Sequence, residues 1–358
     1  MIQGSPIIPS LMYNQSVHFR KGAISLLREI SEAKILVIAY PEASENEAYQ
    51  KAISNLEGNS IFEEKCSAAT ETEVLRLREI YTSKKIDLIV AIGGGQVMDS
   101  SKALRLLLEN HSIDFPSLLE NERASRSINL IAIPTTPSTG SEGNGTAVIK
   151  NEKGVKIPHI HRLLIPEVAI LDSSFLQTIE EKQLHVFIGD IFGHANESLL
   201  SKKASPMTKA ISQSIIALLK EASLELSEKP GSAKALDILL QAGYLGGLMT
   251  GSVYVGVCHA LAHALEQQIG TPHSAGVLTL TPKCLTWHEN VTNDSIYSKL
   301  KSDFEELGLS SYIQPGVLDG VDIDSWIEEA LADPSIKTSP VRMKEGNLRE
   351  LVQWILKK

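Results

Sequence analysis

Cysteine is scarce in this chain, which has three cysteines in 358 residues. Cys66, Cys258 and Cys284 lie far apart and form no Cys-x-x-Cys pair, so the sequence predicts neither a disulfide framework nor a thiolate metal site. A chain without disulfides is typical of a reducing compartment. The segment 1–22 has no basic region ahead of an apolar run and does not resemble a signal peptide. We therefore expect a cytoplasmic protein.

An excess of positive charge is also missing. The chain has 34 Lys and Arg against 43 Asp and Glu, which gives a formal charge of −9. A nucleic-acid binder needs a stripe of Lys and Arg that releases phosphate counterions, and this composition supplies none. The sequence therefore excludes nucleic acid as a partner. The apolar content of 43% is that of a globular chain, whose length corresponds to about two domains with a sizeable core.

Aromatic anchors and a second apolar span are missing around the one long uncharged run, Ala242 to Leu265. The length of this run permits a membrane span, and its glycines recur every four residues, which is typical of close helix contacts. His259 and His263 inside the run argue against a lipid environment. We expect a tightly packed core helix and no membrane association.

The first half of the chain alternates short apolar runs with helical patterns. Strands are expected at 33–39, 86–92 and 128–133, and a helix at 74–83. The runs are continuously apolar, which predicts strands covered on both faces, as in a parallel sheet with crossover helices. We predict an N-terminal α/β domain, Rossmann-like and nucleotide-binding, over residues 1–178.

Long helical patterns fill the second half of the chain, where β-branched runs of strand length are few. The patterns cover 177–201, 205–227 and 233–265, and shorter ones follow as far as Lys358. Thr271-Pro272 and Pro282 should interrupt them. We predict an all-helical domain over residues 179–358.

Three glycines, Gly93 to Gly95, follow the expected strand 86–92 and open a helix. The N–H groups of such a junction can approach a phosphate closely. The residues match neither G-x-G-x-x-G nor a Walker A loop, so a tight turn explains them equally well. A second loop, 134–142 (PTTPSTGSE), should lie at the same sheet edge, and two such loops indicate a nucleotide site. A hydroxyl-rich loop that occurs alone is often only a helix cap or a turn. A lone lysine such as Lys156 is commonly a solvated charge in a loop.

Two histidine-rich windows have the spacing of metal ligands. Asp190 and His194 are four residues apart and should share one helix face, and His259 and His263 repeat this spacing. His273 follows a predicted break, where the chain can turn back. Carboxylate and imidazole ligands without thiolates suit Fe²⁺, Zn²⁺ or Mn²⁺. The residues alone leave two hypotheses open: a metal site, or surface helix pairs and hydrogen-bonded core histidines.

Four ordered motifs resemble those of the iron-containing, group III alcohol dehydrogenase family, over residues 15 to about 290. GGGQVMDSSK (93–102) is similar to the family's GGGSxxDxAK, and PTTPSTGSE (134–142) to PTTxGTGSE. GDIFGHANESLLS (189–201) is similar to GxDALxHAxExYxS, and GVCHALAHALEQQIGTPHSAG (256–276) to GxxHALAHPLGxxxxxPHG. The resemblance implies an N-terminal nucleotide domain and a C-terminal helical metal domain, with the active site in the cleft between them.

Carried over position by position, the resemblance also implies roles for individual residues. The metal, Fe²⁺ or alternatively Zn²⁺, would be bound by Asp190, His194, His259 and His273. His263 would be the catalytic residue that relays the proton. NAD or NADP would contact Gly94, Gly95, Gln96, Asp99, Thr135, Thr136, Thr139 and Lys156. The reaction would be hydride transfer between a small primary alcohol or its aldehyde and NAD(P), in a homodimer or larger homo-oligomer.

The chain departs from the family pattern at several positions. Gln96 stands where the family usually has a serine beside the nicotinamide phosphate. The acidic residue that commonly follows the first strand and favours NAD is absent from Ile38–Pro41, so a 2′-phosphate would meet no repulsion there and NADP stays open. Glu266 adds a carboxylate near the expected metal, and the segment after residue 290 matches weakly.

Two other functions are compatible with the same architecture. A sugar-phosphate cyclase resembling dehydroquinate synthase uses NAD transiently in a lyase cycle, but its metal set typically has Glu where this chain has Asp190. The other is a non-catalytic nucleotide-binding relative, since fold does not fix function. His159, His161 and Arg162 would suit an anionic aldehyde, although we expect them to lie in a solvated loop.

Overall fold

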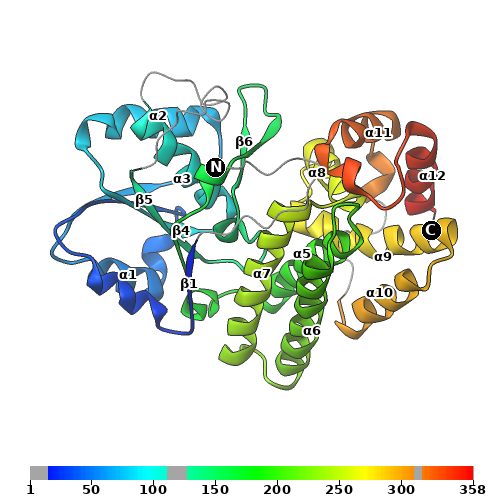
Figure 1. Ribbon diagram of the computed structural model, residues 1–358, viewed down its shortest axis with the longest axis horizontal. Helices are drawn as coiled ribbons and strands as arrows, with labels where there is room; N and C mark the ends of the chain where they lie inside the picture. Colours follow the sequence, from blue (N-terminus) through cyan, green and yellow to red (C-terminus); the bar gives the residue numbers. More distant parts are fainter. Residues whose placement is uncertain (1–14, 111–126, 310–316, 358) are drawn as a thin grey trace. The chain divides into compact units, whose positions relative to one another are not determined.

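The computed structural model describes residues 15–110, 127–309 and 317–357. Most of the segment 1–22, whose sequence does not resemble a signal peptide, lies outside them. The chain forms two compact units, one ending at Thr178 and the other beginning at Ile179. The first is an α/β unit and the second is helical (Figure 1), which confirms the predicted fold class.

A six-stranded parallel sheet forms the centre of the α/β unit. Its order is β1-β8-β5-β4-β2-β3, and every neighbouring pair is parallel. The strands are β1 (Ser16–Phe19), β2 (Lys34–Ala39), β3 (Ser60–Lys65), β4 (Leu88–Gly93), β5 (Asn129–Pro134) and β8 (Val168–Leu171). The predicted strands are the central ones, which are buried on both faces because they are continuously apolar.

Helices cover this sheet, and side chains cap the first two of them. They are α1 (Glu47–Asn55), α2 (Glu71–Tyr81) and α3 (Gly95–Glu109). The Thr70 side chain accepts the Glu73 N–H at 3.1 Å and so caps α2. Helix α3 is buried along almost its whole length, against α2 and the sheet. It therefore holds the glycine loop, from which it starts, in a fixed position.

An antiparallel hairpin was not expected in this unit. Strands β6 (Thr146–Lys150) and β7 (Lys156–Ile160) pair with each other and form a second, small sheet. The expectation that Lys156 and His159 lie in a solvated loop is therefore wrong. His159 is 8% exposed, because it belongs to the inward face of this hairpin. Each strand is only five residues long and β7 contains Pro158, so their alternating pattern gave too weak a signal.

The second unit is all-helical among the described residues, as predicted. Its helices are α5 (Glu181–Leu200), α6 (Pro206–Glu228), α7 (Ala233–Val253), α8 (Val257–Ile269), α9 (His273–Thr292), α10 (Ser295–Glu306), α11 (Ile323–Ala332) and α12 (Glu345–Leu356). Helices α5, α6 and α7 pack side by side (Figure 1). Helix α6 begins at a capping box of Ser205 and Thr208, with Pro206 in its first position.

The predicted single helix over 233–265 is wrong, because the chain bends by 103° between α7 and α8. Tyr254 has a positive φ of 62°, which ends α7, and Gly256 precedes the first residue of α8. The Glu197 carboxylate accepts the N–H groups of Gly256 and Cys258, so the new helix start is satisfied. Among the described residues, no single helix is long and apolar enough to cross a membrane, and only this bent pair reaches that length.

Pro282 does not interrupt the helical pattern as expected. It lies inside α9, which continues to Thr292. A proline removes one hydrogen bond of the helix ladder. Helix α9 packs against α5, α8 and α10, and this packing compensates for the lost bond.

Candidate metal centre and nucleotide loops

Helix α5 carries the first two predicted metal ligands on a buried face. The Asp190 side chain has no exposed surface, and that of His194 is 7% exposed. Asp190 Oδ1 and His194 Nε2 are 3.8 Å apart, as their spacing of four residues predicts. The two side chains therefore point from one helix toward a common place.

His259 from α8 and His273 from the start of α9 reach the same place. Their Nε2 atoms lie 3.7 Å and 3.8 Å from Asp190 Oδ1. One donor atom from each of these three residues lies within 4.8 Å of the others. The rings of His194 and His259 stack with 4.8 Å between their centroids, and Ser274 Oγ donates to Asp190 Oδ2 at 2.9 Å. Asp190, His259 and His273 thus form one group of donor atoms, and His194 lies beside it, through its 3.8 Å approach to Asp190 Oδ1 and its stacking on His259.

These separations fit a shared cation better than hydrogen bonds. A hydrogen bond between nitrogen and oxygen spans about 2.7–3.2 Å, which is shorter than the three distances to Asp190 Oδ1. Ligands that each lie about 2.1 Å from one tetrahedral ion are roughly 3.4 Å apart. His259 Nε2 is buried and makes no hydrogen bond to the part of the chain that the structure describes. One carboxylate with three imidazoles therefore suits a divalent metal such as Fe²⁺ or Zn²⁺.

Glu197, which the sequence analysis gave no role, fixes the ring of His259. The distance from Glu197 Oε2 to His259 Nδ1 is 2.6 Å. The same carboxylate accepts the N–H of Gly256 at 2.8 Å and that of Cys258 at 2.7 Å. With the proton on Nδ1, Nε2 presents its lone pair toward Asp190, which is the tautomer that a metal ligand needs.

The charges around these histidines are set by burial and by the two carboxylates. Burial lowers the pKa of His194 to about 4, although the charge of Asp190 acts in the opposite direction. Burial also acts to lower the pKa of His259, but the hydrogen bond and charge of Glu197 outweigh it and raise that pKa. Burial opposes ionisation of Glu197, yet its hydrogen bonds with His259 and the backbone lower its pKa. Glu197 therefore stays ionised beside the ring that it orients.

Gly193 allows this close packing of α5 with α8 and α9. A Cβ atom at this position would lie 2.3 Å from Val277 Cγ1 and 3.2 Å from His259 Cε1. A side chain there would clash with Val277, which would have to move. The glycine between Asp190 and His194 in sequence is thus required by the convergence of the three helices.

His263, the predicted proton relay, lies beside the four ligands. Its ring stacks on that of His273 with 4.6 Å between centroids and 19° between planes. Its Nδ1 atom is 2.6 Å from Asp333 Oδ2. The side chains of His263 and His273 are 34% and 21% exposed, whereas His259 is 2% exposed. The cluster is therefore accessible on the side of these two histidines.

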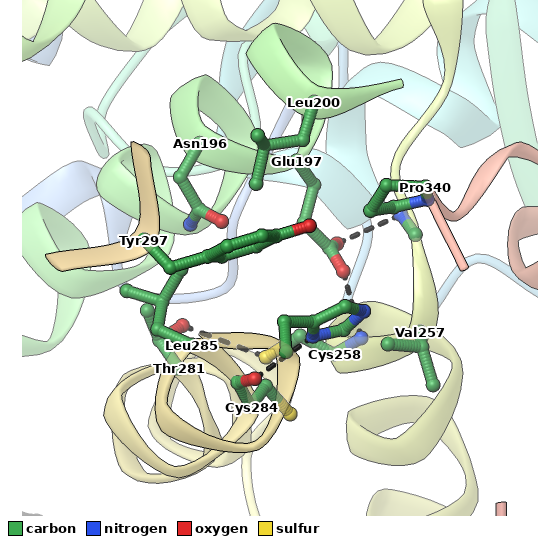
Figure 2. A pocket seen from close by; sticks show the side chains of 12 residues that line it. Asn196, Glu197, Leu200, Val257, Cys258, Thr281, Cys284, Leu285, Tyr297 and Pro340 are labelled. Carbon is green, nitrogen blue, oxygen red and sulfur yellow. Dashed lines mark hydrogen bonds between the residues drawn. The ribbon is translucent and has the colours of Figure 1, made fainter. Parts of the chain in front are cut away.

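A small cavity lies behind Glu197, away from the four converging donor atoms. Figure 2 shows Glu197 bonded to the start of α8, with Tyr297 and Cys258 at the cavity wall. It has room for about one water molecule. Glu197 and Tyr297 both line the cavity, which is not large enough for a substrate.

The two predicted nucleotide loops lie side by side at the carboxyl edge of the sheet. Strands β4 and β5 are neighbours, with Gly93 opposite Pro134, and the Thr135 N–H donates to Gly93 O at 3.1 Å. This is the edge at which open α/β sheets bind ligands. The structure therefore brings together the residues that the motifs placed in one site.

Helix α3 starts at Gly95, with Gly94 at its N-cap and no side chain capping it. The first N–H groups of α3 are thus available to a ligand. A Cβ atom at Gly94 would lie 3.2 Å from Thr136 Oγ1, and one at Gly95 3.0 Å from Thr139 Cγ2. The glycines therefore let both hydroxyl side chains approach the helix start. Gln96 is exposed in the first turn of the same helix.

Asp99 and Lys102, one turn apart on α3, join this helix to the second loop. The fully buried Lys102 Nζ donates to Ser141 Oγ at 2.7 Å, Asn144 Oδ1 at 3.2 Å and Thr146 O at 2.7 Å. Asp99 accepts hydrogen bonds from Ser141 Oγ at 2.6 Å and from the Val148 N–H at 2.9 Å. Its carboxylate thus supports the loops, and 13% of its side-chain surface remains for contact with a cofactor.

Burial dominates the ionisation of this cluster. It lowers the pKa of Lys102 to about 8 and raises that of Glu142 to about 7. Burial also raises the pKa of Asp99, against the charges of Lys102 and Lys156. Lys156 is therefore close to Asp99, at the start of β7 and near the two loops.

Three supporting residues were missed, for different reasons. Glu197 follows Asp190 by seven residues and His194 by three, so its position on the same helix face could have been predicted from the sequence. Lys102 belongs to the motif GGGQVMDSSK, but nothing in the neighbouring sequence indicates that its amine is buried. Asp333 lies 70 residues from His263 in sequence, so nothing in the pattern connects them.

Comparison with known proteins shows the family to which the chain belongs. The chain matches the sequence model of the iron-containing alcohol dehydrogenases over residues 14–173, and that of the C-terminal part of the Fe-containing alcohol dehydrogenase family over residues 189–312. It is 26% identical to the probable alcohol dehydrogenase EutG of Salmonella typhimurium, over 80% of this chain and 76% of that protein.

Two solved structures share the fold. A 1,3-propanediol oxidoreductase superposes with a TM-score of 0.87 at 20% identity and covers 97% of this chain and 100% of its own. The sulfoacetaldehyde reductase from Bifidobacterium kashiwanohense in complex with NAD⁺ superposes with a TM-score of 0.80 at 20% identity, over 98% and 99% of the two chains. From its motifs, its fold and the two matching sequence models, which together span most of its length, the chain belongs to the iron-containing alcohol dehydrogenase family.

Proposed function

We propose that this protein interconverts a small primary alcohol and its aldehyde by hydride transfer with a nicotinamide dinucleotide, using a divalent metal, Fe²⁺ or Zn²⁺. The observation that carries the proposal is the convergence of Asp190 Oδ1 with the Nε2 atoms of His194, His259 and His273 at 3.7–3.8 Å. The reaction also requires a cofactor site, and the two loops at the ends of β4 and β5 would bind the pyrophosphate of the dinucleotide.

The protein's own residues would have distinct tasks in this reaction. Asp190, His194, His259 and His273 would hold the metal, which supplies Lewis acidity toward the substrate oxygen when bound. Glu197 would keep His259 in the ligating tautomer. His263 would exchange the proton of the substrate hydroxyl with solvent, because it is the histidine of the cluster with the most exposed side chain.

For the cofactor we propose a preference for NAD over NADP. Tyr40 follows β2, the strand next to β4, where dinucleotide folds contact the adenosine ribose. Burial raises the pKa of Tyr40, and the charges of Glu42 and Glu45 raise it further. Two carboxylates thus lie near this strand end, although neither follows it directly. Their charge would disfavour a 2′-phosphate, contrary to the expectation from the sequence that nothing would repel it.

The test is reduction of an aldehyde panel by NADH and NADPH after loading the full-length protein with Fe²⁺ or Zn²⁺. The proposal expects stoichiometric consumption of NADH and loss of at least about 100-fold in turnover in His259→Ala, together with loss of bound metal. His185→Ala is the matched control, since His185 lies on α5 with a side chain that is 34% exposed, and its Nε2 atom is 4.0 Å from Glu181 Oε1. Bound NADH without turnover on any aldehyde, or an unchanged His259→Ala variant, would refute the proposal.

A further inference from the structure

Asp333 lies between α11 and the short 3₁₀ helix Pro334–Thr338, and its two oxygens have separate tasks. Oδ1 accepts the Ser335 N–H at 2.8 Å and so caps the 3₁₀ helix. Oδ2 is 2.6 Å from Nδ1 of His263. Capping requires only one carboxylate oxygen, so Oδ2 of Asp333 is available for the hydrogen bond with His263.

We propose that Asp333 is a positioning residue that holds His263 in the tautomer with its proton on Nδ1, so that Nε2 is the atom that exchanges the substrate proton. The inference rests on the proposed function for the use of His263, but the tautomer itself follows from the local geometry.

An ionised carboxylate can only accept hydrogen bonds, so the proton of this pair must be on the nitrogen of His263. Burial opposes ionisation of Asp333, but its hydrogen bonds with His263 and Ser335 outweigh it and lower its pKa to about 2. Asp333 therefore remains an acceptor at every pH at which the enzyme would work. The exchangeable position of the neutral ring is then Nε2 alone.

The position of Asp333 is fixed by the core beneath it. Trp326 of α11 is fully buried and donates from Nε1 to Leu261 O of α8 at 2.9 Å. Ile336 belongs to the same apolar cluster, and Thr338 Oγ1 donates to Val255 O. Helix α8, which carries His263, is thus joined to the segment on both sides of Asp333. The aspartate cannot move away without disturbing this core.

The ring of His263 has a second constraint from its stacking on His273. Stacking fixes the plane of the ring, and the bond to Asp333 fixes its rotation within that plane. Asp333 lies beyond residues 189–312, the stretch that matches the C-terminal family model.

Two substitutions at Asp333 separate its two tasks. In Asp333→Ser the hydroxyl can still cap Ser335 but is too short to reach His263 as well. In Asp333→Asn the carbonyl oxygen is expected to keep the cap, which turns the amide N–H₂ group toward His263. That group donates, so it would force the proton onto Nε2, and a wrong tautomer of this kind lowers kcat by up to about 10⁴-fold in serine proteases.

The experiment combines kinetics with ¹⁵N NMR of the full-length protein labelled at its histidines. In the kinetic arm we expect kcat to fall by roughly 100-fold or more in Asp333→Asn and by about 10-fold in Asp333→Ser, with KM changed by less than about threefold. Asp322→Ser is the matched control, because Asp322 caps α11 through Asp324 and Ser325 and is expected to leave kcat unchanged. Because both Asp333 variants are expected to keep the cap on Ser335, their thermal midpoints should stay close to that of the wild type, and a large decrease would show that the cap was lost.

The NMR arm is read on the metal-free protein, with His263→Asn to assign the signal. We expect the proton on Nδ1 in the wild type and on Nε2 in Asp333→Asn. A proton on Nε2 in the wild type, or wild-type kcat in Asp333→Asn, would overturn the proposal. If the protein reduces no aldehyde, the proposed function fails, and the NMR arm still decides the tautomer.

Discussion

The carboxylate of Glu197 accepts a hydrogen bond from His259 Nδ1 at 2.6 Å and also accepts the N–H groups of Gly256 and Cys258 at the start of α8. One buried side chain thus orients a proposed metal ligand and begins the helix that carries it. The bend between α7 and α8, where a single helix 233–265 was predicted, places the start of α8 beside Glu197.

Glu197→Gln should weaken metal binding by about 10–100-fold, as loss of an outer-shell partner of a ligating histidine commonly does. The glutamine keeps the volume but removes the charge that favours the proton on Nδ1 of His259. Affinity is measured by competition with a chelator. The control is Glu181→Gln on the same helix, whose side chain is 71% exposed. Equal affinities in Glu197→Gln and wild type would contradict the assigned role.

Lys102→Met should destabilise the α/β unit by about 3–5 kcal/mol. The substitution keeps the length of the side chain but leaves Ser141, Asn144 and Thr146 without their donor and Asp99 without its cation. Urea unfolding of the full chain measures the loss. Lys51→Met, at an exposed position of α1, is the control and should change stability by less than about 0.5 kcal/mol. A loss as small as that of the control would mean that the amine of Lys102 is not needed in the loop structure.

Glu42→Gln combined with Glu45→Gln should narrow the preference for NADH over NADPH by about 10-fold. Removing two charges near the end of β2 lowers the repulsion that a 2′-phosphate would meet, so the effect should appear in KM for NADPH and decrease with added salt. Glu57→Gln, an exposed position after α1, controls for net charge. A ratio that stays unchanged would place the adenosine ribose away from Tyr40.

Local signals in the sequence pointed to the two histidine-rich windows and to both nucleotide loops, and the family resemblance then selected Asp190, His194, His259 and His273 as the metal-binding candidates. A spacing of four residues on a helix, or three glycines after a strand, constrains its own neighbourhood. The structure added what depends on distant residues. Asp333 reaches His263 across 70 positions, and Lys102 reaches three acceptors more than 35 positions away.

The prediction of secondary structure was wrong where tertiary contacts override the local sequence pattern. The apolar run 233–265 looks uniformly helical, yet Tyr254 and Gly256 break it where Glu197 compensates the new helix start. At Pro282 the error was the opposite one: a break was predicted, but α9 continues through the proline because its packing stabilises the helix. In both cases the deciding partner lies on another helix.

Glu142 should make the stability of the folded chain decrease as the pH rises. Burial raises its pKa to about 7 in the folded state from the ordinary 4.5, so between these values the folded chain holds a proton that the unfolded chain has lost. Stability should therefore fall as pH rises from about 4.5 to 7, and Lys102, whose pKa is about 8, remains charged over this range. Glu142→Gln removes the titrating group. Its thermal midpoint should decrease less between pH 5 and 7 and exceed that of the wild type at pH 7.5 by about 2–4 °C, which corresponds to about 1 kcal/mol in a unit of this size. The exposed Glu152→Gln is the control, with the slope of the wild type. A variant slope equal to that of the wild type would show that another group is responsible.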